Sequence, residues 1–230
     1  MNFDMFTIAK REFLALFKSF KSVAIVLLFV VFAFSISNFV KSNPALFLNE
    51  SSNPYVSGIR FLTTVFGFLF VLTLSHDVLN REVESQTIRF VVTKISKSSI
   101  VVGKYIGVSL FWIVCLSISF TVIFISIQRF DILEFLRLLT FISYAIGINF
   151  LITTLVSKTS YSMFISLLGG ILFPTFGIWS MFSSNSILQV VKYVTPFHYI
   201  TLMDWKSYLP FAFSLLFLMV SIYTFRRKDL

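Results

Sequence analysis

Long apolar runs alternate with short polar segments along the whole chain. Five uncharged runs are at least 19 residues long, at 22–40, 105–128, 138–157, 159–191 and 207–225. About 20 apolar residues are needed to cross a hydrocarbon core of roughly 30 Å. With a further apolar stretch after Gly58, the pattern predicts an all-α integral membrane protein, residues 1–230 forming a single transmembrane domain. Its six transmembrane helices are expected at 23–40, 59–75, 105–127, 138–156, 161–182 and 207–225.

Composition and charge support this class. Hydrophobic residues make up 57% of the chain, which includes 31 Phe, and charged residues only 13%. A soluble domain of this size cannot bury so much apolar surface. The net charge of +9 does not indicate nucleic-acid binding, because 13 of the 19 Lys and Arg lie in 1–22, 76–104, 157–160 and 226–230. Six spans place those four segments on one side, so the positive-inside bias predicts a plasma-membrane protein with both termini in the cytoplasm.

The first 22 residues have a helical period of apolar and basic positions. Phe13 and Phe17 fall on one face, and Lys10 and Arg11 fall on the other. A basic amphipathic helix directly before a span is typical of a segment that lies in the membrane interface. We therefore predict an interface helix at 1–22 whose apolar face contacts lipid.

A polar segment, 76–104, separates the second and third spans. It carries acidic residues, then basic ones, and an apolar patch at Ile88, Phe90, Val91 and Val92. We expect a helix that continues beyond the second span and then a short second helix. A merely solvated loop does not need the apolar patch, so helix-in-groove docking to a partner is the favoured interpretation.

Motifs for chemistry are missing from the sequence. It has no GxxxxGK[ST] phosphate loop, no HExxH, and a single Cys115 within a span. We therefore expect a chain that is not an enzyme and that holds no cofactor or metal, and an intramembrane hydrolase is the least favoured class. Charged residues are also absent from the middles of the predicted spans, which argues against an ion-coupled carrier.

The segment 183–206 is less apolar than its neighbours and is interrupted at Pro196. The uncharged run 159–191 before it is too long for one span and too short for two spans with a loop, and dividing it into two spans would place the basic cluster 226–228 outside. A re-entrant pair of half-helices is one arrangement that fits.

The polar segment carries a resemblance to a known family. Residues 82–91 (EVESQTIRFV), 95–97 (ISK) and 100–104 (IVVGK) are similar to the region after the second span in permease subunits of ABC-2 type (type V exporter) ABC transporters. Gln86 stands where glycine is usual in that family, and Lys94 stands where proline is usual. With the amphipathic start, the six spans and the broken segment before the last span, the resemblance covers the whole chain.

The resemblance implies a dimeric permease that works with two separate ATP-binding cassette ATPase subunits, so ATP is bound in the partner and not in this chain. The second permease copy can be identical or a sibling. The segment between spans two and three then acts as a coupling helix. Its expected ATPase contacts are Arg81, Glu82, Glu84, Thr87, Ile88 and Arg89.

The expected substrate is hydrophobic or amphipathic, with a preference for an antimicrobial or other peptide. This follows from aromatic-rich spans, from the similarity in size to peptide exporters of Gram-positive bacteria, and from a composition compatible with such a genome. The alternative function is a non-transporting membrane sensor or a peptide-immunity protein, which would protect cells without any ATPase.

Overall fold

Six membrane-length helices make up the fold. The computed structural model describes residues 2–47, 53–88, 92, 95–202 and 204–228, and these ranges contain helices and no strand. Six of the helices are long and apolar enough to cross a membrane, which confirms the all-α membrane class. These six are α2 (Phe20–Ser42), α3 (Ser57–Leu74), α6 (Lys97–Ile127), α7 (Ile132–Leu155), α8 (Thr159–Phe182) and α11 (Leu209–Arg227). The shorter elements are α1 (Asn2–Lys18), η1 (Pro44–Phe47), η2 (Pro54–Val56), α4 (Asn80–Glu84), α9 (Ser186–Val194), α10 (Pro196–Ile200) and η3 (Trp205–Tyr208).

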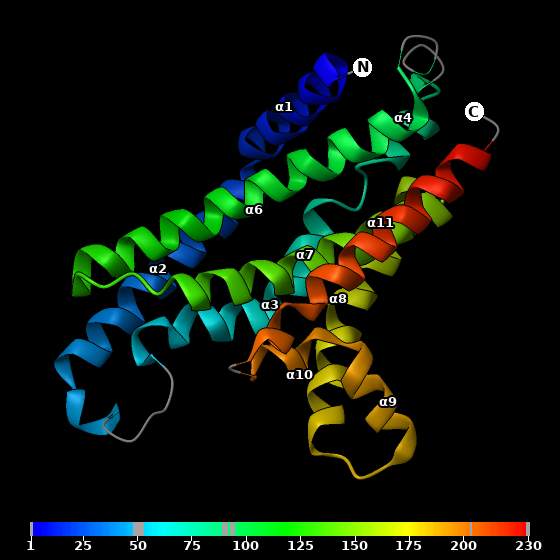
Figure 1. The fold of residues 1–230 in the computed structure, drawn as a ribbon. Coiled ribbons are helices and arrows are strands. Elements are labelled where there is room, and N and C mark those ends of the chain that lie inside the picture. Colours follow the sequence, from blue (N-terminus) through cyan, green and yellow to red (C-terminus); the bar gives the residue numbers. More distant parts are fainter. Residues whose placement is uncertain (1, 48–52, 89–91, 93–94, 203, 229–230) are drawn as a thin grey trace.

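Both ends of the chain lie at the same end of the bundle, which we call the terminal end (Figure 1). The described residues 75–88 after α3 and the connection 156–158 also lie there. At the opposite end are η1 and η2, the α6–α7 connection, and the α9–α10 region. The six long helices therefore cross in alternating directions.

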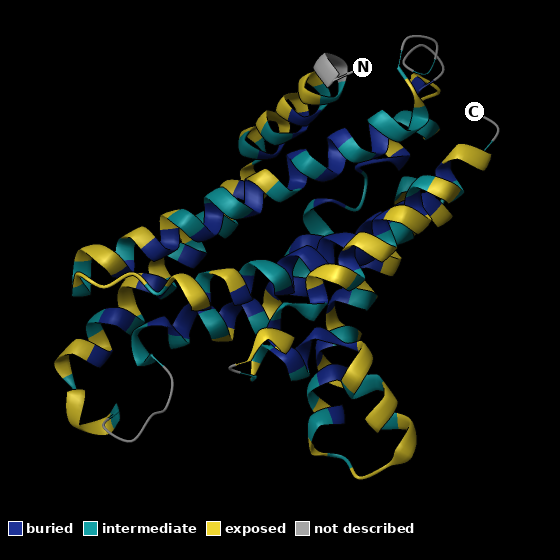
Figure 2. Ribbon diagram, in the orientation of Figure 1, coloured by how far each residue is buried: buried dark blue, intermediate teal, exposed yellow. Residues whose placement is uncertain are grey.

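Helix α7 is the centre of the bundle. Within its apolar stretch of 18 residues 78% are buried, compared with 22–50% in the corresponding stretches of the other five long helices. It contacts α3, α6, α8, α10 and α11, and Figure 2 shows its buried residues in the middle of the molecule. Gly147 lets α11 approach closely, because a Cβ atom there would lie 3.0 Å from the Cα of Ser214. Small residues at such crossings are typical of helix packing in membranes.

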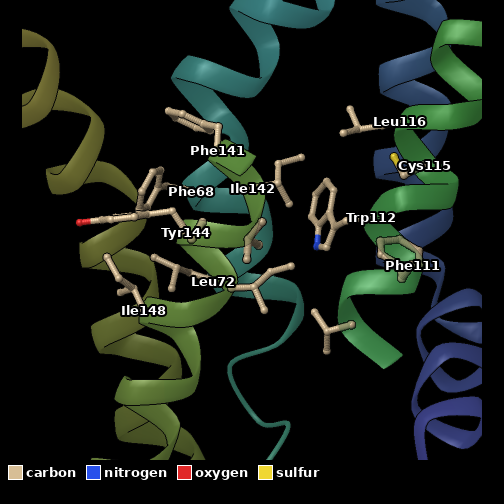
Figure 3. Packing of buried hydrophobic residues seen from close by; sticks show 14 of the residues in the cluster. Phe68, Leu72, Phe111, Trp112, Cys115, Leu116, Phe141, Ile142, Tyr144 and Ile148 are labelled. Carbon is tan, nitrogen blue, oxygen red and sulfur yellow. The ribbon is translucent and has the colours of Figure 1, made fainter. Parts of the chain in front are cut away.

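Aromatic rings fill the core between α3, α6 and α7 (Figure 3). Phe68 stacks on Phe173 and Phe197, with ring centroids 5.3 and 5.6 Å apart. Gly177 of α8 lies directly against the ring of Phe197. The short helix α10 is held in the bundle by this buried phenylalanine.

The helix boundaries differ from the expected spans where charged residues begin a helix. Helix α6 starts at Lys97, not at 105, and α7 starts at Ile132, not at 138. Ser96 and Asp131 cap these helices by accepting the amide N–H of Ser99 and Glu134. Hydropathy assigned these first turns to loops because it cannot recognise polar side chains that find partners in the folded chain, such as Lys97 with the carbonyl oxygen of Lys228 and Arg137 with Glu134.

The predicted break before the last span is occupied by α9 and α10, which are separated at Thr195. All of α9 is at least partly exposed, whereas Pro196, Phe197 and Tyr199 of α10 are buried. The two short helices therefore differ in environment, and α10 is the one anchored in the bundle.

Candidate functional site

The segment after the second span does not continue as one helix, and that expectation is wrong. Helix α3 ends at Leu74, turns follow, and α4 covers only Asn80–Glu84. The chain then reverses at Gln86, whose φ of 56° is in the left-handed region. The result is a short helix and turn at the terminal end, which we call the α4 turn (residues 80–87).

A buried ion cluster lies beneath the α4 turn. The Nζ atom of Lys104 in α6 is 3.0 Å from Oε1 of Glu82 and 3.9 Å from Oε2 of Glu12 in α1. It also donates to the backbone carbonyl of Val78. The side chain of Lys104 is 2% exposed, and a buried lysine is tolerated only when its charge is paired and its donors are satisfied. One lysine therefore fastens α1, α4 and α6 together.

Burial raises the pKa of the Glu12 carboxyl above its ordinary value, although the charge of Lys104 acts in the opposite direction. The distance of 3.9 Å between Oε2 of Glu12 and Nζ of Lys104 is too long for a hydrogen bond. Glu82 is therefore the principal partner of the lysine.

Helix α1 packs on α6 through two glycines one turn apart, Gly103 and Gly107. A Cβ atom on Gly107 would lie 2.6 Å from the carbonyl oxygen of Ala9. A Cβ atom on Gly103 would lie 2.8 Å from the carbonyl oxygen of Met5. This GxxxG spacing allows two helix backbones to approach, and it is the signal from which α1–α6 packing could have been read in the sequence.

The α4 turn is also attached to α8. Oε2 of Glu84 accepts the amide N–H of Thr159, the first residue of α8, at 3.0 Å. Hydrogen bonds from the Thr159 hydroxyl and amide lower the pKa of the Glu84 carboxyl. A carboxylate at this position satisfies an N–H that lacks a partner within the helix and interacts favourably with the helix dipole.

The structure separates the residues predicted to contact a partner into three groups. Arg81 and Thr87 are exposed, and Arg81 lies 3.4 Å from Asp77. Glu82 and Glu84 are used within the chain, as described above. Ile88 is 2% exposed and belongs to the chain's own core, so its assignment as a docking side chain is corrected. Arg89 lies outside the described residues.

Helix α1 packs on the bundle, because one of its faces is covered by α6. Phe17 packs edge-on against Phe111 of α6, with ring centroids 5.0 Å apart, and Phe13 packs against Phe17 at 4.9 Å. Lys10 and Arg11 are exposed. The predicted separation of aromatic and basic faces is present, but much of the aromatic face contacts protein.

A second buried ion cluster, at the opposite end of the bundle, was missed in the sequence. Glu134 of α7 pairs with Arg60 of α3 and with Arg137, the latter at 3.0 Å. Glu134 and Arg137 had been assigned to a loop. The spacing of three residues between them on one helix is a signal that could have indicated the pair.

Of the aromatic residues of α3, Phe61 and Phe66 are exposed, whereas Phe68 is buried in the core. No group of three or more His, Cys, Asp or Glu side chains suited to a metal ion occurs in the described part of the chain. The candidate site is the α4 turn, a polar segment attached to several helices by ion pairs and a hydrogen bond.

Neither a scan of protein-family models nor a search of curated proteins finds a match for this chain.

Proposed function

We propose that this chain is the membrane-spanning permease subunit of an ATP-driven exporter of the ABC-2 type. In this proposal it performs no covalent chemistry, and ATP is hydrolysed by separate ATPase subunits on the cytoplasmic side. In this proposal the terminal end of the bundle faces the cytoplasm, and the chain lies in the plasma membrane of a Gram-positive bacterium.

One observation carries the proposal: the α4 turn is polar and exposed on its outer side, yet it is fastened to three helices on its inner side. Lys104 joins Glu82 to α6, and Glu84 joins the turn to the start of α8. Arg11 of α1 lies 3.9 Å from Glu82. A partner that pushes on such a turn moves helices, whereas a solvated loop would absorb the displacement.

The outer side of the turn supplies the proposed docking groups. Arg81, Ser85, Gln86 and Thr87 are exposed. Charged and polar groups of this kind give specificity and a fast association rate to a partner surface. Glu82 and Glu84 act in this proposal as positioning residues that hold the turn in place.

The proposed substrate is hydrophobic or amphipathic, with a peptide as the favoured case. Phe61 and Phe66 are exposed on the outer surface of α3, and their rings are 6.5 Å apart. In a dimer with a second permease copy, a face of this kind can line a path for an apolar cargo. The chain's own share of that path is then aromatic and uncharged.

The test is affinity purification of the tagged full-length chain from its native membrane, with mass spectrometry of its partners. We expect an ATPase subunit to co-purify with the wild-type chain and to be lost from an Arg81→Ala, Thr87→Arg double variant. Arg129→Ala, an exposed arginine at the opposite end, is the matched control and should retain the ATPase.

Absence of any ATPase from repeated purifications of the folded wild-type chain would contradict the proposal and favour a sensor or immunity protein. Retention of the ATPase by the double variant would contradict the docking assignment alone. Reversing Glu82 and Glu84 to lysine is a poor test, because it would also break the chain's internal contacts.

A further inference from the structure

A polar pocket of about 180 Å³ opens beside the break between α1 and α2, at the terminal end. Its polar lining residues are Glu12, Ser19, Lys21, Thr73, His76, Asp77 and Arg81. A single water needs only about 10–15 Å³ of such space. The pocket therefore has room for a small polar group with several heavy atoms, but not for a peptide or an acyl chain.

The pocket is lined by a buried carboxylate, Glu12, whose ion pair with Lys104 is too long, at 3.9 Å, for a hydrogen bond. The side chain of Glu12 is 9% exposed, and it makes no hydrogen bond to the described residues. Asp77 lines the same pocket, and its carboxylate accepts one long hydrogen bond of 3.4 Å from Arg81, with which it also forms an ion pair. Because buried polar groups are normally hydrogen-bonded, the arrangement favours a ligand that brings N–H donors and a positive charge.

His76 adds a third acceptor. Its Nδ1 lies 2.8 Å from the carbonyl oxygen of Thr73, and a carbonyl can only accept. In the neutral ring Nδ1 therefore carries the proton, which leaves Nε2 as an acceptor.

Donors for an anion also line this pocket. Lys21 and Ser19 lie at the start of α2, where the first backbone N–H groups lack intrahelical partners. The Ser19 side chain makes no capping hydrogen bond. Arg81 supplies a guanidinium. A phosphate fits these groups, because helix N-termini and guanidinium groups both bind phosphate oxygens.

The position of the pocket identifies the source of such a ligand. It lies where α2 begins and α3 ends, and so at the boundary of two membrane-length helices. The adjacent Phe20 is 87% exposed, and an exposed Phe beside a basic amphipathic helix is typical of a segment that inserts its apolar side into the membrane interface. We propose that this pocket binds the headgroup of an aminophospholipid, with the ammonium at Glu12 and Asp77 and the phosphate at Lys21 and Arg81. The site shares Arg81 with the proposed docking surface, but its tests use Glu12 and Lys21 and do not depend on the proposed transport function.

The test uses the full-length chain in nanodiscs made of phosphatidylcholine with a minor share of one probe lipid. The probes are phosphatidylethanolamine, its N-monomethyl and N,N-dimethyl derivatives, and phosphatidylglycerol. Lipid retained on the released protein is measured by native mass spectrometry. We expect phosphatidylethanolamine to be enriched roughly tenfold over phosphatidylcholine, because a hydrogen bond to a charged group has about this effect on affinity. Enrichment should fall with each added methyl group.

Two variants and one control refine the assignment. Glu12→Gln should abolish the preference for phosphatidylethanolamine over phosphatidylcholine. Lys21→Gln should lower the retention of phosphatidylethanolamine and of phosphatidylglycerol to a similar extent. Lys18 is an exposed lysine outside the pocket, so Lys18→Gln should change neither the lipid preference nor the amount of lipid retained. The methylation series needs only the wild-type chain, so the result does not depend on how well a variant folds.

Equal retention of phosphatidylethanolamine and phosphatidylcholine by the wild-type chain would overturn the proposal, and so would an unchanged preference in folded Glu12→Gln. Soluble glycerophosphoethanolamine, added to nanodiscs of phosphatidylcholine alone, separates a lipid from a free metabolite. Saturable binding of the soluble compound with no enrichment of the lipid would overturn the assignment to a membrane lipid.

Discussion

Lys104 and Glu82 form a buried ion pair, with Nζ and Oε1 3.0 Å apart and side chains 2% and 12% exposed. The pair joins the α4 turn to the third span. Removing one member leaves the other charge buried without its partner, which is far more destabilising than the loss of a surface pair.

The first prediction concerns this pair. Lys104→Met should lower the free energy of unfolding by about 3–5 kcal/mol, because Glu82 remains buried. Adding Glu82→Gln should recover part of that loss. Unfolding in detergent, followed in a double-mutant cycle, measures both effects. Lys18→Met, at an exposed position of α1, is the control and should change stability by less than about 0.5 kcal/mol. Strictly additive effects of the two substitutions would contradict the pairing.

A second prediction concerns the contact of α1 with α6. Gly107→Ala should destabilise this packing by about 1–3 kcal/mol, because the new methyl group would lie 2.6 Å from the carbonyl oxygen of Ala9. Hydrogen exchange of the α1 amides should rise as α1 separates. Gly169→Ala is the matched control, since its Cβ would meet only the Leu72 side chain at 3.7 Å. Equal protection of α1 in both variants would contradict the close approach.

The sequence predicted the six spans because each depends on a local run of about 20 apolar residues. It did not predict the ion cluster at the terminal end, because Glu12, Glu82 and Lys104 come from three separate elements that meet only in the folded chain. The same reason explains Ile88, whose apolar side chain was interpreted as a docking group and is covered by the chain's own core. Periodicity shows that a residue needs burial, but not which surface buries it.

A third prediction concerns the left-handed residue of the α4 turn. Gln86 has φ 56°, a conformation that costs a non-glycine residue on the order of 1 kcal/mol. Gln86→Gly should therefore stabilise the chain by up to about 1 kcal/mol in thermal unfolding. Ser85 has φ −77°, so Ser85→Gly has no such strain to relieve and should be neutral or destabilising. A loss of stability in Gln86→Gly would contradict this account.

The fourth prediction concerns the ion cluster at the opposite end. Glu134→Gln should destabilise the chain by about 3 kcal/mol or more, because Arg60 and the buried Arg137 lose their shared carboxylate. Asp131→Asn removes a charge one turn earlier but keeps a good helix cap, so we expect a change of a few tenths of a kcal/mol. The comparison is made by unfolding in the same detergent. Equal losses of stability in the two variants would show that removing a negative charge from this part of α7, and not disrupting the buried cluster, causes the effect.

The last prediction concerns pH. The raised pKa of Glu12 means that the folded chain holds this proton more tightly than the unfolded chain, whose carboxyl has its ordinary value of 4.5. The stabilising contribution is therefore complete below about pH 4.5 and is lost as the pH rises through the folded-state pKa. Glu12→Gln cannot titrate, so the stability of the wild-type chain relative to this variant should fall as the pH rises from 4.5. Melting temperatures of both proteins across pH 4.5–8, in detergent without aminophospholipid, measure the difference. If the wild-type chain instead gained relative stability with rising pH, the carboxylate would be stabilised by Lys104 more than it is destabilised by burial.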